Sequence, residues 1–233
     1  MIDVSSFIVG PLQENAYLLV DRDSGEAVFV DPGAEGERLV AAVEAANARL
    51  TEIWLTHAHF DHVGNLGLFP ESRVHVAARE VQFWTGPHRR KPLFHHSVEE
   101  DELDHLAEVV ASGRAHLTSG RTWVAPGVEM VEVGGHTPGM SMVRVRTAAG
   151  WVLLTSDAVH YYEECERAMP FTSVADIVGM YDAFDTIHAM VDAGEVQHVV
   201  AGHDPGTLAR LADTAGATVD DDGLVGRIGG GTR

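Results

Sequence analysis

The segment THAHFDHVG occupies residues 56–64 and directly follows the apolar run IWL at residues 53–55. It places three imidazoles and a carboxylate, from His57, His59, Asp61 and His62, where a predicted buried strand becomes a loop. Side chains two residues apart in an extended segment point the same way, so we expect His57 and His59 to share one metal ion. Asp61 and His62 could face a second ion. A solvated loop or a helix cap would explain one such residue but not this density, so the segment predicts a metal site.

Three further polar groups follow predicted strands elsewhere in the chain. His136 lies in GGHTPG, residues 134–139, after a predicted strand at 129–133. Asp157 ends the sequence TSD after the apolar strand at 151–154, and His203 lies in AGHD after a strand that ends at residue 200. Polar residues at the ends of strands are where sites on such scaffolds collect. Each group alone is typical of a turn, but together with residues 56–64 they predict one composite metal centre.

The remaining pattern predicts two batches of strands, each ending in a helix, and therefore a two-sheet sandwich with helices outside. The first batch has a helix at 36–50 and strands at 4–9, 16–20, 27–30, 53–55 and 74–77. The second batch has helices at 174–193 and 205–211 and strands at 129–133, 141–145, 151–155 and 198–201. Helical patterns at 80–84 and 98–111 indicate a helical insert at about 79–120. We expect one domain over residues 1–212 and an acidic, Gly-rich, partly disordered tail over residues 213–233.

The composition excludes several classes of function. The 233 residues carry 16 Lys and Arg against 35 Asp and Glu, a formal net charge of −19 that would repel nucleic acid and anionic membranes. No apolar stretch is long enough to span a bilayer, and the N-terminus lacks the pattern of a signal peptide. Cys165 is the single cysteine, and a lone thiol is typical of a reducing compartment. We therefore expect a cytoplasmic protein in which Cys165 is inert.

The ordered set HAHFDH, GGHTPG, SDA and GHD resembles the metallo-β-lactamase superfamily over about residues 5–210. The resemblance implies an α+β fold, a four-layer αββα sandwich of two mixed β-sheets with helices outside, and a hydrolase domain over residues 1–212. It also implies a binuclear centre, with one ion held by His57, His59 and His136, a second held by Asp61, His62 and His203, and Asp157 bridging both. The cofactors would be two divalent metal ions, with zinc as the first choice, although such sites also accept Fe, Mn or Co.

The motifs also narrow the expected reaction. True β-lactamases of this fold usually lack an aspartate at the position of Asp157, which argues against that activity. The stretch VGPLQENAYLL at residues 9–19 resembles small glyoxalase II-type thioesterases, whereas residues 64–70, 79–84, 153–159 and 202–204 resemble N-acyl homoserine lactonases. We therefore expect a hydrolase that opens a lactone or cleaves a related ester by attack of a metal-bridging hydroxide, with Asp61 passing the proton to the leaving group. The expected partner is a small-molecule lactone or ester, with no nucleic acid or membrane, and a homodimer is left open.

Two alternatives on the same scaffold are a glyoxalase II-like thioesterase and an iron-dependent sulfur dioxygenase, and a third is a non-catalytic metal-binding protein. The complete ligand set disfavours the third.

Homoserine lactonases typically carry a tyrosine three residues after the bridging aspartate, where this chain has His160, followed by Tyr161 and Tyr162. We expect His160 or Tyr161 to polarise the substrate carbonyl. The 30 residues after His203 leave no room for the glutathione-binding domain of full-length glyoxalase II, which weakens the thioesterase alternative.

Overall fold

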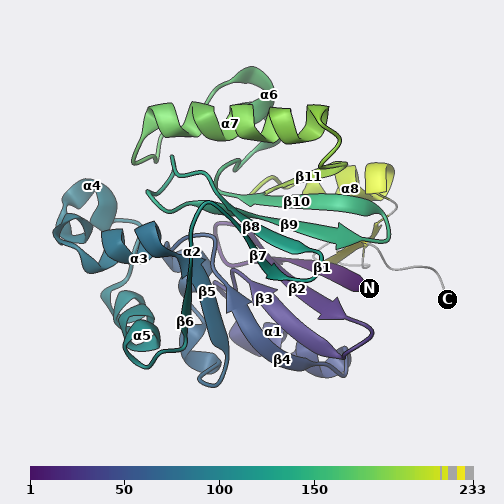
Figure 1. The fold of residues 1–233 in the computed structure, drawn as a ribbon, viewed down its shortest axis with the longest axis horizontal. Coiled ribbons are helices and arrows are strands. Elements are labelled where there is room, and N and C mark those ends of the chain that lie inside the picture. Colours follow the sequence, from purple (N-terminus) through teal and green to yellow (C-terminus); the bar gives the residue numbers. More distant parts are fainter. Residues whose placement is uncertain (216, 220–224, 229–233) are drawn as a thin grey trace.

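The computed structural model describes residues 1–215, 217–219 and 225–228. Two β-sheets pack face to face, with α1, α3 and α5 outside one sheet and α6 and α7 outside the other (Figure 1). Each sheet contains both parallel and antiparallel strand pairs. The predicted α+β sandwich of two mixed sheets is therefore confirmed.

The first sheet has eight strands in the order β12-β13-β1-β2-β3-β4-β5-β6. Their bounds are β1 (Ile2–Val9), β2 (Glu14–Asp21), β3 (Glu26–Val30), β4 (Arg49–Trp54), β5 (Arg73–Ala77), β6 (Ala115–Thr118), β12 (Thr218–Val219) and β13 (Val225–Ile228). The first three strands form an antiparallel meander, and the connection through α1 (Gly36–Ala45) makes β4 parallel to β3. The helix predicted over 36–50 is too long at its end, because Arg49 and Leu50 pair with β3 and begin β4. Asn47, with φ of 50°, separates the two elements.

The second sheet has five strands in the order β11-β10-β9-β8-β7. Their bounds are β7 (Arg121–Ala125), β8 (Val128–Glu132), β9 (Ser141–Thr147), β10 (Gly150–Ser156) and β11 (His198–Ala201). A tight hairpin at residues 148–150 joins β9 to β10, and Gly150 there adopts a φ of 114°, which favours glycine. The helix α7 (Ile177–Asp192) begins with Asp176 as its N-cap, whose carboxylate accepts from the backbone N–H of Val178.

Three apolar clusters account for the layering. The cluster between the sheets includes Tyr17, Trp54, Met130 and Val143, all of them buried. A second cluster packs α1 and the helix α5 (Glu100–Ala111) against the first sheet, and a third packs α7 against the second sheet. Each sheet is therefore covered on both faces, which is why its central strands are apolar along most of their length.

The middle of the chain is mainly helical. It contains α2 (Phe60–Val63), η1 (Leu66–Leu68), α3 (Ala78–Thr85), η2 (Pro87–Arg90), α4 (Pro92–His95) and α5. The range 79–120 predicted as a helical insert thus holds helices up to residue 111, followed by β6, which pairs in parallel with β5. Between the two predicted helical patterns, the chain forms η2 and α4.

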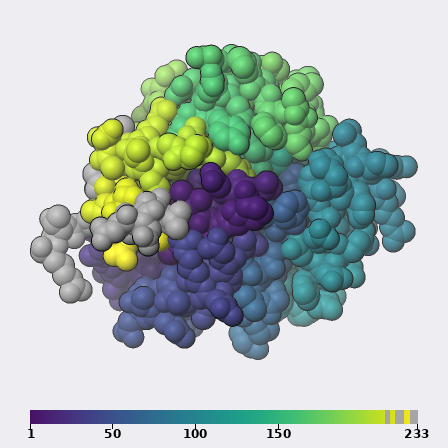
Figure 2. Space-filling view, turned by 180° about the vertical axis from the view of Figure 1, so that it is seen from behind, coloured from purple at the N-terminus to yellow at the C-terminus, as the bar shows by residue number. Residues whose placement is uncertain are grey.

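The C-terminal part of the described chain joins the first sheet. The helix α8 (Thr207–Ala215) follows β11, and β13 pairs antiparallel with β1, next to β12. Seen from behind, the C-terminal segment in yellow lies against the N-terminal strand in purple (Figure 2). The predicted tail at 213–233 thus includes the end of α8 and two strands, while residues 216, 220–224 and 229–233 lie outside the described residues. Within the described ranges, no helix is both long enough and apolar enough to cross a membrane.

Candidate metal centre

The fold brings all seven predicted ligands together at one end of the sandwich. Four of them, His57, His59, His136 and Asp157, offer ligand atoms that lie within 4.8 Å of one another. A second group of three, Asp61, His62 and His203, meets the same distance limit. These side chains come from the loop and helix after β4, the loop between β8 and β9, the end of β10 and the end of β11. Each of the two groups could hold a metal ion.

The carboxylate of Asp157 lies between the two groups, and each of its oxygens faces one of them. Its Oδ2 lies 3.2 Å from Nε2 of His136 and 3.7 Å from Nε2 of His57. Its Oδ1 lies 3.0 Å from Nε2 of His203 and 3.3 Å from Nε2 of His62. Asp157 therefore has one oxygen close to each group of candidate ligands.

The buried histidine nitrogens are suited to a cation rather than to one another. Nε2 of His57 and Nε2 of His62 are buried and have no hydrogen-bond partner within the described ranges. Nδ1 of His59 and Nε2 of His136 lie 2.9 Å apart. Facing lone pairs of this kind repel each other unless a metal ion or a proton lies between them. The residues present therefore fit divalent metal ions.

Burial determines the charge of the first histidine group. Burial, together with the neighbouring histidines, holds the pKa of His57 and of His59 well below the ordinary histidine value. Burial likewise lowers the pKa of His136 to about 3. Neutral imidazole is the form that binds a metal, so these three side chains are already in the ligating state at neutral pH.

His62 and Asp157 shift each other's pKa, and a metal ion bound at His62 would displace the proton that Asp157 favours there. Burial disfavours charge on both, but the Asp157 and Asp61 carboxylates outweigh it and hold the pKa of His62 well above the ordinary value. Conversely, the imidazoles of His160, His62 and His203 overcome the effect of burial and hold the pKa of Asp157 well below its ordinary value. Asp157 is therefore an anion at neutral pH, which a bridging ligand must be.

Sequence reasoning missed Asp31, a buried carboxylate that contacts the segment carrying the ligands and orients the ring of His62. Its Oδ1 accepts from the backbone N–H of Thr56 at 2.8 Å, and its Oδ2 accepts from Oγ1 of Thr56 at 2.6 Å. The same Oδ2 lies 3.1 Å from Nδ1 of His62 and so turns the Nε2 atom of that ring toward the ligand cluster. The sequence feature that could have indicated Asp31 is the turn sequence DPG directly after β3. Asp31 adopts a φ of 48° in this turn, and the absence of a Cβ at Gly33 lets the turn contact the backbone of Asp61.

A second missed carboxylate, Glu80 of α3, ties two ligand loops together. Its Oε1 accepts from the backbone N–H of Ala58 at 3.0 Å and from Nε1 of Trp84 at 2.6 Å. Its Oε2 accepts from Oγ1 of Thr137 at 2.7 Å and from the backbone N–H of Gly139 at 2.9 Å. This fully buried side chain thus fixes the loop that carries His57 and His59 against the loop that carries His136. Trp84 is buried in this packing.

Glu14 at the start of β2 is the third carboxylate that the sequence did not single out. It is buried, and neither of its oxygens has a hydrogen-bond partner within the described part of the chain. Its Oε1 lies 3.8 Å from Nδ1 of His62, and burial raises its pKa well above the ordinary value. A glutamate directly before Asn15 gives no sequence signal of this position, since only the packing of β2 against the centre buries it.

His160, Tyr161 and Tyr162 follow Asp157 and separate in space. His160 is buried with its Nε2 3.1 Å from Oδ2 of Asp157; burial lowers its pKa, but the Asp157 and Glu164 carboxylates outweigh this effect and raise the pKa to about 9. Tyr161 is 41% exposed and its ring lies 6.3 Å from that of Phe171. The hydroxyl of Tyr162 donates to the backbone carbonyl of Val199, away from the centre. Of the two tyrosines, only Tyr161 remains available to a substrate.

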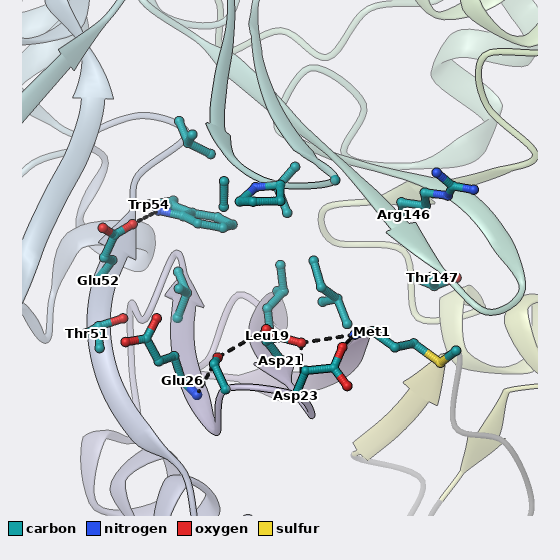
Figure 3. Close-up of a pocket in the computed structure, with 18 residues that line it drawn as sticks. Met1, Leu19, Asp21, Asp23, Glu26, Thr51, Glu52, Trp54, Arg146 and Thr147 are labelled. Carbon is teal, nitrogen blue, oxygen red and sulfur yellow. Dashed lines mark hydrogen bonds and ion pairs between the residues drawn. The ribbon is translucent and has the colours of Figure 1, made fainter.

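The cavity drawn in Figure 3 lies at the other end of the sandwich. It has a volume of about 750 Å³ and is lined by the far ends of β2 and β3, the middle of β4 and the turn between β7 and β8. Its lining residues Asp21 and Glu26 lie at the ends of β2 and β3 opposite to those that lead to the metal centre. The cavity and the metal centre are therefore separate.

Comparisons with known proteins agree with this site. The family model described as the metallo-beta-lactamase superfamily matches residues 9–203. A hydroxyacylglutathione hydrolase, GloC, of Haemophilus influenzae is 31% identical over 135 residues, which cover 56% of this chain and 60% of that protein. An N-acyl homoserine lactonase of Bacillus thuringiensis is 32% identical over 117 residues, which cover 50% of this chain and 41% of that protein. The chain spans less than two thirds of the length of the curated relatives it matches.

Among solved structures, a quorum-quenching N-acyl homoserine lactone lactonase superposes with a TM-score of 0.67. The two proteins are 24% identical, and the superposition covers 82% of this chain and 79% of that chain. At this level of identity the likeness establishes a shared fold. The family match spans the residues that carry all seven predicted ligands, and the chain belongs to the metallo-β-lactamase superfamily.

Proposed function

We propose that this protein is a binuclear metal-dependent hydrolase that opens a lactone or cleaves a related ester. The observation that carries the proposal is the position of Asp157, whose two oxygens face two separate groups of ligands. One ion would be held by His57, His59, His136 and Asp157, and the other by Asp61, His62, His203 and Asp157. Zinc suits these ligands, and Fe, Mn or Co would be accepted by the same donor set.

The metal ions supply a water with a lowered pKa and an electrophile for the substrate carbonyl. The chain's own residues do the rest. Asp61, whose Oδ2 lies 3.8 Å from the Nε2 atoms of both His62 and His203, is placed to pass a proton to the leaving oxygen. His160 is placed to donate a hydrogen bond to the oxygen on which negative charge develops, with Tyr161 beside it at the surface.

The lactonase-like substrate is supported by the lactonase relative and by the lactonase-like stretches around the site. A second candidate, cleavage of a thioester at the same site, is favoured by the similarity to a hydroxyacylglutathione hydrolase. Hydrolysis of an ester and of a thioester carbonyl would need the same nucleophile and the same electrophile from the metal centre. The two substrates differ in the leaving atom, so substrate assays separate the two candidates.

The test measures metal content and hydrolysis together. We expect two metal ions per chain by elemental analysis and opening of small lactones in a pH-indicator assay, lost after chelation and restored by added zinc. The substrate panel includes lactones of several ring sizes, an aryl ester and a glutathione thioester. Asp157→Asn should lower kcat/KM by roughly 10³-fold or more, because a lost bridging ligand weakens both the nucleophile and the electrophile.

The matched control is Asp23→Asn, which neutralises an exposed carboxylate far from the centre and should leave kcat/KM unchanged. Cleavage of the thioester alone would support the second candidate. About one iron per chain with no hydrolysis of any ester, lactone or thioester would favour the sulfur dioxygenase alternative. An Asp157→Asn protein with metal bound and wild-type turnover would contradict the proposed mechanism.

A further inference from the structure

The helix α6 (Tyr162–Arg167) follows Asp157 directly and carries a buried carboxylate at Glu164. One of its oxygens, Oε1, accepts from the backbone N–H of Tyr161 at 3.1 Å, which closes the N-terminus of the helix. The other oxygen, Oε2, lies 3.5 Å from Nδ1 of His160. Because Oε1 is held by the backbone, the direction of Oε2 is set by the helix.

The ring of His160 is packed among other side chains, and 7% of its side-chain surface stays exposed. Its Nε2 faces Oδ2 of Asp157 at 3.1 Å, the ring of Phe171 lies against it at 4.4 Å, and the ring of His136 lies 4.8 Å away. Nδ1 of His160 and Oε2 of Glu164 are both buried and neither has a hydrogen-bond partner in the described chain, although they lie within 3.5 Å of each other. Each of these two buried atoms therefore has the other as its polar neighbour.

We propose that Glu164 is a positioning residue for His160, which accepts the Nδ1–H of the ring and so keeps Nε2 directed at the metal centre. This inference rests on the proposed function, in which His160 contacts the substrate. A histidine ring has two polar edges, and the group bonded to one nitrogen decides the tautomer and the direction of the other. The carboxylate of Glu164 supplies that group from the next turn of the chain, four residues after His160.

A histidine at position 160 needs a second residue, here Glu164, to fix the orientation of its ring. A tyrosine at this position would carry its hydroxyl on a symmetric ring and would need no orienting partner. An imidazole ring in the same place can turn either a nitrogen or a carbon toward the metal centre, so it needs a bond at one nitrogen to fix its orientation. In this chain, the histidine at position 160 has the buried Glu164 of α6 beside it.

The decisive variant is Glu164→Gln. The amide oxygen keeps the bond from the N–H of Tyr161, and the amide NH₂ then faces Nδ1 of His160, where it opposes the ring N–H instead of accepting from it. We expect kcat to fall about 10- to 100-fold with KM and metal content unchanged. Glu163→Gln, which neutralises the neighbouring exposed carboxylate on the same helix, is the matched control and should keep wild-type kcat.

A double-mutant cycle separates positioning from a general effect on α6. In a His160→Tyr background the imidazole is absent, so adding Glu164→Gln should change kcat by less than about twofold. Equal losses in both backgrounds would show that Glu164 acts through the fold of the helix and would overturn the proposal. So would a Glu164→Gln protein with wild-type kcat.

A spectroscopic readout keeps the test independent of activity. In ¹⁵N-histidine spectra of the zinc-loaded protein, we expect His160, assigned by its loss in His160→Tyr, to carry a proton on Nδ1 and to show a shifted Nδ1 resonance in Glu164→Gln, because that N–H has lost its carboxylate acceptor. If no substrate in the panel is hydrolysed by the wild type, the proposed function fails, yet this signature still decides the contact between Glu164 and His160. An unchanged His160 signal in Glu164→Gln would refute it.

Discussion

At the residue scale, the centre depends on carboxylates outside the predicted set of seven ligands. Asp31 is the clearest case, because one buried side chain holds the backbone of Thr56, its hydroxyl and the Nδ1 atom of His62. The hydroxyl of Ser156 also lies 3.2 Å from the same Oδ2. Groups that orient a ligand in this way determine its tautomer and its basicity.

Asp31→Asn should therefore weaken metal binding about 10- to 100-fold. Asparagine tolerates the left-handed backbone at this position, so the turn survives, but its NH₂ group replaces one acceptor and opposes the Nδ1–H of His62. Competition with a chromophoric zinc chelator measures the affinity, with Asp23→Asn again as the exposed control. Wild-type zinc affinity in a folded Asp31→Asn protein would contradict the role given to this residue.

At the element scale, the start of α5 contains an unfavourable charge. Acidic residues in the first turn of a helix normally stabilise it through the helix dipole, and Glu100, Asp101 and Glu102 occupy that turn. Glu102, however, is partly buried, and burial together with the carboxylates of Glu99 and Asp61 raises its pKa to about 7. The folded chain therefore binds a proton at Glu102 that the unfolded chain has already released.

This shift makes the contribution of Glu102 depend on pH. The folded pKa lies above the unfolded value of 4.5, so the stability from this group is fully present below about pH 4.5 and is lost as the pH rises through 7. Glu102→Gln should be close to neutral at pH 5 and should stabilise the protein at pH 8 by about 1 kcal/mol, after allowance for its partial exposure.

Urea denaturation of wild type and Glu102→Gln at the two pH values gives the free energy of unfolding. Glu108→Gln, on the exposed side of the same helix, is the control and should show no such difference between the two pH values. The same offset at pH 5 and pH 8 for Glu102→Gln would exclude a titration of Glu102 as its cause.

At the scale of the whole molecule, the metal centre joins the two sheets. Its ligands come from the loop after β4 in the first sheet and from the ends of β10 and β11 and the loop after β8 in the second. Ions bound there cross-link the sandwich at one end, while the apolar cluster between the sheets holds it elsewhere. A ligand that binds only the folded state stabilises it in proportion to the logarithm of its concentration over Kd.

Removal of metal should therefore lower Tm by about 5–10 °C, because ligand at 100 times Kd contributes about 2.7 kcal/mol and each kcal/mol shifts Tm of a chain of this size by about 2–4 °C. Calorimetry with and without chelator measures the shift. His57→Ala, which lacks a ligand, should show a much smaller response to the chelator. An unchanged Tm after loss of metal has been verified by elemental analysis would contradict this cross-linking role.

Some expectations from the sequence stay predictions at this scale, namely the cytoplasmic location, the homodimer and the boundary at residue 212. Others are confirmed, above all the sandwich of two mixed sheets and the family. The candidate ligands could be predicted because each follows a strand in a short polar segment, and such segments have a local signal. His57, His136, Asp157 and His203 were predicted in this way.

By itself, then, the sequence determined the strands, the ligand segments and the family, because these depend on residues that are neighbours in the chain. Only the tertiary structure decided which polar side chains are buried against the centre and with which partner. Asp31, Glu80 and Glu164 look like ordinary surface carboxylates in sequence, and β13 looks like part of a tail. Their roles come from contacts with segments far away in the chain, and no local pattern records the desolvation that makes those contacts matter.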